Sequence, residues 1–186
     1  PKPSSAASDV YKRQLLVQSL SLSSGYLLIT YQKIGKILMA WSTYIEQNQN
    51  RFIDELKTFI SIPSVSASDE HFQDVVKAGE WVSSKLQSIG ISNARLMKTE
   101  THPVVYGDWL HAGDDKPTVL IYGHFDVQPA DPYELWDSPP FEPLVKDGKI
   151  FGRGASDDKG NMLAPILAVE ALSLIHISEP TRRRGI

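Results

Sequence analysis

The sequence predicts an α/β layered domain, and three features indicate it. Two amphipathic helical patterns occupy residues 43–60 and 69–89. Residues 118–122 form a continuously apolar run, as expected for a strand that is covered on both faces. A further apolar helical pattern follows at residues 161–174. Helices that precede and follow a buried strand are typical of α/β layered domains.

The composition excludes several classes of protein. The chain has 186 residues, of which 19 are basic and 22 acidic, and its net charge of -3 argues against a nucleic-acid partner. It contains no cysteine, so it has no disulfide framework and no thiolate nucleophile, and any metal must be held by His, Asp or Glu. No apolar run approaches the ~20 residues of a membrane-spanning helix. We therefore expect a soluble chain with no membrane partner, and the absence of cysteine is compatible with the cytoplasmic location that we expect.

The two ends differ from the middle of the chain. Residues 1–38 are interpreted as a non-native or disordered leader, because residues 1–14 are polar and show no structural period, and residues 175–186 as a non-native tail. The end segments SSAASDVYKRQ and LIHISEPTRRR resemble translated sequencing-adaptor DNA. Residues 15–38 also allow a secretory-signal interpretation, which would make the protein secreted or membrane-anchored. We assign residues 39–174 to the native domain.

The boundaries of the helices follow from local signals. Pro63 is expected to end the first helix, since the residue before a proline disfavours helical geometry. Asp69 is expected to cap the second helix, and Gly90 to stop it. In the last helix Pro165 is expected in or near the first turn, where a missing N–H is tolerated.

Strands are expected between the second and the last helix. Strand-like patterns occupy residues 94–97 and 104–109, ahead of the apolar run at 118–122. A hairpin is expected around Asp147 and Gly148, because Asp-Gly suits a tight turn between residues 144–145 and 150–151. No internal repeat is present.

Three residues form the strongest candidate site: His124, Asp126 and Asp157. Residues two apart on an extended strand point to the same side, so His124 and Asp126 are expected to project together past the end of the apolar strand. Sites in open α/β sheets lie at such ends. The imidazole is a metal ligand, a nearby carboxylate orients its ring, and Asp157 offers further oxygen ligands from a glycine-lined loop.

A structural interpretation of the same residues stays open. An isolated His near a strand end is often a hydrogen-bonded structural residue. Asp157 and Asp158 would then cap the following helix, and Lys159 would be a solvated charge. The glycines around Arg153 would serve turns only, because they lack the spacing of a dinucleotide-binding loop.

The motifs resemble those of a known family. The segments IYGHFDVQP, WDSPPFEP and KDGKIFGRGASDDKGNM, together with the loop SIPSVSA, are similar to the zinc metallopeptidases that include carnosine and cytosolic nonspecific dipeptidases, carboxypeptidase G, aminoacylase, acetylornithine deacetylase and succinyl-diaminopimelate desuccinylase. WDSPPFEP resembles the dipeptidase branch. The resemblance implies the N-terminal part of a three-layer α/β/α catalytic domain, truncated, with the lid or dimerisation domain absent.

The resemblance also implies roles for the candidate residues. His124 would be a ligand of one zinc ion, and Asp157 would bridge two zinc ions through a carboxylate that precedes a cis peptide bond to Asp158. Asp126 would belong to the catalytic machinery as the carboxylate that orients His124. Arg153, Asp158 and Lys159 would shape the loop rather than act chemically, and manganese or cobalt are alternatives to zinc.

The implied function is hydrolysis of an amide bond in dipeptides or small peptides. The family's catalytic Glu-Glu pair and its remaining ligands have no counterpart here, and Glu170, His176 and Glu179 do not match them. One histidine and one bridging aspartate fall short of the three or four ligands of a zinc site, so we expect this chain to be an inactive fragment of a parent that forms homodimers. The alternatives are an N-acyl amino acid deacylase of the same family and a non-catalytic domain that kept the fold.

Overall fold

The computed structural model describes residues 24–177, with side chains from residue 41 to residue 173, and two compact units divide the chain, Pro1–Met39 and Ala40–Ile186. Helix α2 (Ser24–Ile60) begins in the first unit and ends in the second. Residues 24–38, which lie in the expected leader, are therefore helical, while the rest of the leader and residues 178–186 of the expected tail lie outside the described residues. Among the described helices, none has the length and apolar character that crossing a membrane requires.

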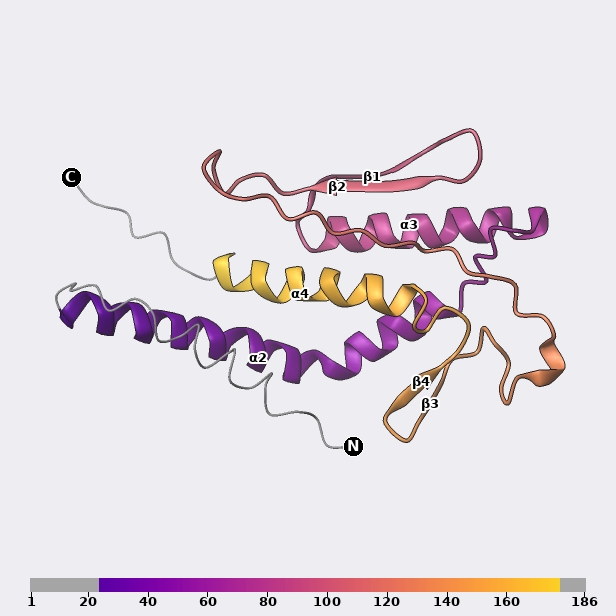
Figure 1. The fold of residues 1–186 in the computed structure, drawn as a ribbon, viewed down its shortest axis with the longest axis horizontal. Coiled ribbons are helices and arrows are strands. Elements are labelled where there is room, and N and C mark those ends of the chain that lie inside the picture. Colours follow the sequence, from indigo (N-terminus) through magenta and orange to yellow (C-terminus); the bar gives the residue numbers. More distant parts are fainter. Residues whose placement is uncertain (1–23, 178–186) are drawn as a thin grey trace, which may run out of the picture. The chain divides into compact units, whose positions relative to one another are not determined.

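In the part of the chain that the structure describes, every other element lies in the second unit, and Figure 1 shows these elements. They are the short 3-10 helix η1 (Asp69–His71), helix α3 (Phe72–Ser88), strands β1 (Ser92–Met97) and β2 (Val104–Asp108), the 3-10 helix η2 (Tyr133–Leu135), strands β3 (Leu144–Lys146) and β4 (Lys149–Phe151), and helix α4 (Lys159–Ile177). The expected helices, the strand-like segments at 94–97 and 104–109 and the hairpin around Asp147 and Gly148 are thus present.

The strands of the described residues form two antiparallel hairpins. Strands β1 and β2 pair with Arg95 opposite Tyr106, and their hairpin packs along α3 (Figure 1). Strands β3 and β4 pair with Val145 opposite Ile150. Between them, Asp147 and Gly148 both have positive φ, 52° and 71°, which is the geometry that a two-residue hairpin turn requires.

The core joins the three helices of the second unit. Phe59 from α2 is fully buried and stacks on Trp81 of α3 with ring centroids 4.5 Å apart. From α4, Leu163 and Ile166 complete the cluster. Apolar residues at helical spacing therefore face inward, as the sequence predicts.

Two expected helix details are wrong. Asp69 does not cap α3: it begins η1, and α3 starts three residues later behind His71, which makes no side-chain capping hydrogen bond. Pro165 lies inside α4, six residues after its first residue and thus beyond the first turn. The stop at Gly90 is confirmed, because this residue has a φ of +82°, which glycine adopts without strain.

The expected buried strand at residues 118–122 is also wrong for this chain. The segment has no regular secondary structure, and Val119 and Leu120 are 81% and 90% exposed. Among the described residues no strand lies beside it, since the two sheets contain only β1 with β2 and β3 with β4. Burial of a strand depends on partners elsewhere in the fold, and here none is available to cover the segment.

Candidate metal centre

The structure brings the three candidate residues together. The His124 ring lies between two carboxylates: Nδ1 is 3.1 Å from Asp126 Oδ1, and Nε2 is 3.1 Å from Asp157 Oδ1. The backbone carbonyl of Asp126 also lies 3.1 Å from Nδ1. The side chains of His124 and Asp126 are 43% and 38% exposed and that of Asp157 is 84% exposed, so the group is open to solvent and to ions.

Two segments of the chain position these residues. His124 and Asp126 follow the apolar segment 118–122, and Asp157 ends the glycine-containing loop before α4. The backbone N–H of His124 donates to Asp158 Oδ2 over 3.1 Å, which fastens one segment to the other. The expected cis peptide bond between Asp157 and Asp158 is present.

Close packing at the glycines keeps the two segments adjacent. A Cβ atom added to Gly123 would lie 2.6 Å from Met162 Cγ and 2.9 Å from Asp158 Oδ2. At Gly154, which has a φ of +85°, an added Cβ would lie 2.6 Å from Val127 Cγ1. Both positions therefore need glycine for close approach, as suggested by the glycines in the motifs.

The electrostatics around His124 favour a cation. A neutral imidazole carries one N–H, yet both ring nitrogens face carboxylate oxygens. Partial burial lowers the pKa of His124, but the Asp126 carbonyl and the Asp126, Asp158 and Asp157 carboxylates outweigh it, so the pKa is raised overall. Either a second proton or a metal cation between Nε2 and Asp157 relieves the lone-pair repulsion.

The distances fit a shared zinc ion. Nitrogen and oxygen ligands sit about 2.0–2.2 Å from tetrahedral zinc, which leaves two such atoms about 3.3–3.6 Å apart. The separation of 3.1 Å between His124 Nε2 and Asp157 Oδ1 is close to the lower end of this range. In the described part of the chain, no group of three or more His, Asp or Glu side chains is arranged to hold a metal ion. His124 Nε2 and Asp157 Oδ1 are thus two potential ligands that lie close together.

The residues around the site hold the loop in place. Lys159 is fully buried, and Nζ donates to the carbonyls of Phe59 at 2.9 Å and Ile62 at 2.6 Å, so it is not a solvated charge. Burial lowers its pKa to about 7, although Asp126 and Asp74 act in the opposite direction. The Arg153 guanidinium lies 5.1 Å from the Trp136 ring centroid, and the backbone N–H of Arg153 donates to the Pro140 carbonyl. Both residues shape the loop.

Sequence reasoning missed one contact within the site. Ser66 Oγ donates to Asp126 Oδ2 over 2.5 Å. Ser66 belongs to the SIPSVSA loop, which matched the family, but no chemical role was expected for its hydroxyl. The only sequence signal was the resemblance of that loop, because the two residues are 60 positions apart.

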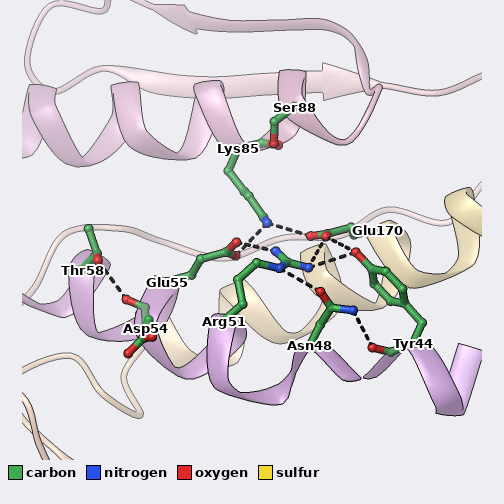
Figure 2. Close-up of polar contacts among 9 residues, drawn as sticks. All are labelled: Tyr44, Asn48, Arg51, Asp54, Glu55, Thr58, Lys85, Ser88 and Glu170. Atoms are coloured by element: carbon green, nitrogen blue, oxygen red, sulfur yellow. Dashed lines mark hydrogen bonds and ion pairs between the residues drawn. The ribbon is translucent and has the colours of Figure 1, made fainter. Parts of the chain in front are cut away.

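Sequence reasoning also missed a charged network between the helices. Figure 2 shows Glu170 of α4 held by Arg51 and Tyr44 of α2 and by Lys85 of α3. The oxygens of Glu170 lie 2.6 Å from Arg51, 2.7 Å from Tyr44 and 2.7 Å from Lys85. Glu55 of α2 completes the network through ion pairs with Arg51 at 2.5 Å and with Lys85 at 2.7 Å. Glu170 therefore has a structural role.

Comparison with known proteins shows which class the chain resembles. Residues 120–182 match the model of peptidase family M20/M25/M40. The chain is 35% identical over 128 residues to a cysteinylglycine-S-conjugate dipeptidase of Corynebacterium striatum. The aligned region covers 69% of this chain and 27% of that protein. The motif-based resemblance to this class of metallopeptidases is confirmed.

Solved structures agree on the fold. The dipeptidase Dug1p of Saccharomyces cerevisiae matches with a TM-score of 0.66 and 29% identity, over 74% of this chain and 31% of that one. Human carnosine dipeptidase 1 matches with a TM-score of 0.63 and 31% identity, over 75% of this chain and 31% of that one. The fold class is thus confirmed as that of M20 peptidase catalytic domains, and the resemblance to the dipeptidase branch is confirmed as well. The chain spans less than a third of the length of these three relatives.

Proposed function

We propose that the protein carrying this sequence is a di-zinc metallohydrolase that cleaves the amide bond of dipeptides or small peptides. The observation that carries this proposal is the His124 ring, whose two nitrogens both face carboxylates at 3.1 Å. The relatives support a peptide substrate, since one is named for cysteinylglycine conjugates and the others as dipeptidases. They favour a dipeptidase over the N-acyl amino acid deacylase.

Each residue of the site has a distinct task in this proposal. His124 Nε2 would bind one zinc ion, and Asp157 would bind the same ion and reach a second. Asp126 would accept a hydrogen bond from Nδ1–H and so keep the Nε2 lone pair free for the metal. When bound, zinc supplies Lewis acidity toward the amide carbonyl.

We further propose that the 186-residue chain does not itself turn over substrate. His124 and Asp157 give the first zinc ion two ligands and the second only one, whereas zinc sites use three or four. A general base must also accept and return a proton, and we assign that role to none of the described residues. A carboxylate outside this sequence would supply it in the full-length protein, for which we propose a homodimer.

The test is zinc binding by the chain, measured by isothermal titration calorimetry. We expect weak binding that His124→Ala and Asp157→Ala both abolish. His111→Ala is the matched control, because His111 is exposed and contacts Ser92 rather than the site. Zinc binding that survives both site variants would rule out the metal centre.

Activity is measured in the same samples with the dipeptide Cys-Gly and with an N-acetyl amino acid, in the presence of zinc. We expect no hydrolysis of either. Turnover of Cys-Gly that is lost in His124→Ala would contradict the proposed inactivity of the chain while supporting the dipeptidase assignment. Turnover of the acyl amino acid alone would favour the deacylase.

A further inference from the structure

The loop of residues 64–66 is fastened to the segment that carries the site. Ser64 Oγ donates to the carbonyl of Phe125 over 2.6 Å, and the N–H of Val127 donates to the carbonyl of Ser64 over 2.9 Å. Val65 and Val127 form a parallel bridge. Ser64, Val65 and Val127 are buried, so the bond between the two segments is shielded from water.

Ser66 extends this attachment to a side chain of the site. Its hydroxyl donates to Asp126 Oδ2 over 2.5 Å, while Asp126 Oδ1 lies 3.1 Å from His124 Nδ1. The two oxygens of one carboxylate thus have different partners on opposite sides. A carboxylate rotates readily about its last torsion, so a second partner is needed to fix its plane. Ser66 provides that partner.

The loop that carries Ser66 is also held by a contact with His102. His102 Nε2 lies 3.0 Å from the Ser66 carbonyl, and the His102 ring packs at 5.8 Å from the Phe72 ring. A water molecule that binds a carboxylate loses entropy when it is immobilised. A hydroxyl on an ordered backbone is already in place, so it holds the carboxylate without that cost. This matters at Asp126, whose side chain is 38% exposed and therefore accessible to competing water.

We propose that Ser66 is a positioning residue that sets the tautomer of His124 through Asp126. With Oδ2 held by Ser66, Oδ1 stays beside Nδ1 and accepts its hydrogen bond together with the Asp126 carbonyl, which also lies 3.1 Å from Nδ1. The Nε2 lone pair then points toward Asp157, where the proposed function requires it, and in that respect the inference rests on the proposed function. Ser66 acts on the metal only through two other residues.

The experiment compares Ser66→Thr with Ser66→Val in the full chain. The two variants have nearly the same shape, and only Thr keeps the hydroxyl. Ser61→Ala is the control, because Ser61 is exposed and its hydroxyl donates within its own turn to Lys57 O. Long-range ¹H–¹⁵N correlation spectra of the metal-free chain report the ratio of the Nδ1–H to the Nε2–H tautomer at His124.

We expect the wild type and Ser66→Thr to show His124 mainly as the Nδ1–H tautomer, and Ser66→Val to lower the ratio several-fold. Zinc affinity should fall about tenfold in Ser66→Val, which is the lower end of the loss seen when the hydrogen-bond partners of metal ligands are removed. It should recover in Ser66→Thr. Ser61→Ala should match the wild type in both measurements.

The outcomes separate this inference from the proposed function. If the wild type binds no zinc but Ser66→Val still shifts the tautomer ratio, the metal centre fails and the positioning role stands. If Ser66→Val folds and keeps the wild-type tautomer ratio, the positioning role is overturned. The same holds if Ser66→Val fails to fold while Ser66→Thr folds, because the hydroxyl then serves the fold as a whole.

Discussion

Replacing Glu170 by glutamine tests the charged network between α2, α3 and α4. The wild-type network is electrically balanced, with Arg51 and Lys85 facing Glu55 and Glu170 (Figure 2). Glutamine keeps the shape of the side chain but removes its charge. The two cations then share one carboxylate, and the site carries a net charge of about one unit in a poorly solvated environment.

The expected cost is about 3 kcal/mol in the free energy of unfolding. Breaking a buried ion pair from one side costs about 3–5 kcal/mol. The side chains of Glu170 and Lys85 are each 9% exposed, but that of Arg51 is 37% exposed, so water relieves part of the imbalance. The lower end of the range therefore applies.

Urea denaturation followed by circular dichroism measures this cost as a lower midpoint at an unchanged slope. Glu80→Gln is the matched control, since Glu80 lies on the exposed face of α3, and it should change stability by less than about 0.5 kcal/mol.

Burial alone would raise the pKa of Glu170, but Lys85, Tyr44 and Arg51 lower it overall.

The sign of the pH dependence follows from that direction. A carboxyl group whose pKa is lower in the folded than in the unfolded state stabilises the fold above the unfolded value of 4.5, and this contribution is lost as the pH falls through the folded pKa. The gap between wild type and Glu170→Gln should therefore narrow below pH 4.5. An equal urea midpoint for the two proteins at pH 7, or a gap that does not depend on pH, would refute the reasoning.

Three further substitutions test the geometry elsewhere. Gly160→Ala places a Cβ 2.1 Å from the Ala155 carbonyl oxygen and should destabilise the chain by more than about 1 kcal/mol; an unchanged thermal midpoint would contradict this contact. Gly148→Ala should cost about 1 kcal/mol, because this residue has a φ of +71°, and urea denaturation measures it. Val119→Lys should leave stability within about 0.5 kcal/mol, since Val119 is 81% exposed, and should reduce light scattering at high protein concentration. Scattering equal to that of the wild type would show that the apolar segment does not drive association.

Local features of the fold were predictable from the sequence. The β3–β4 hairpin depends on Asp147 and Gly148, whose preference for positive φ is a property of these residues alone. The proximity of His124 and Asp126 followed from their spacing of two residues. The start of α3 was misplaced because the choice between a cap at Asp69 and a preceding 3-10 turn depends on packing that Asp69 does not determine.

Features that depend on distant residues were not predictable from residue patterns. The exposure of residues 118–122 could not be read from their composition, because an apolar strand is buried only where other strands and helices cover it. Glu170 and Arg51 are 119 positions apart, and Ser66 and Asp126 are 60 apart, so no periodicity connects them. Asp157 was grouped with His124 because it lies in a glycine-lined loop, but their contact joins residues 33 positions apart, which no periodicity connects.

The attachment of Val127 to the loop of residues 64–66 has a consequence for amide hydrogen exchange. The N–H of Val127 is bonded to the Ser64 carbonyl and buried, so it should exchange only when this loop opens. In the described part of the chain, the amides of residues 119–122 have no backbone acceptor and should exchange nearly as fast as in an unfolded peptide. A boundary between fast and slow exchange therefore falls within a few residues, and His124 and Asp126 lie on it. The candidate site is thus anchored on its Val127 side, while the described backbone hydrogen bonds include none from the amides of residues 119–122.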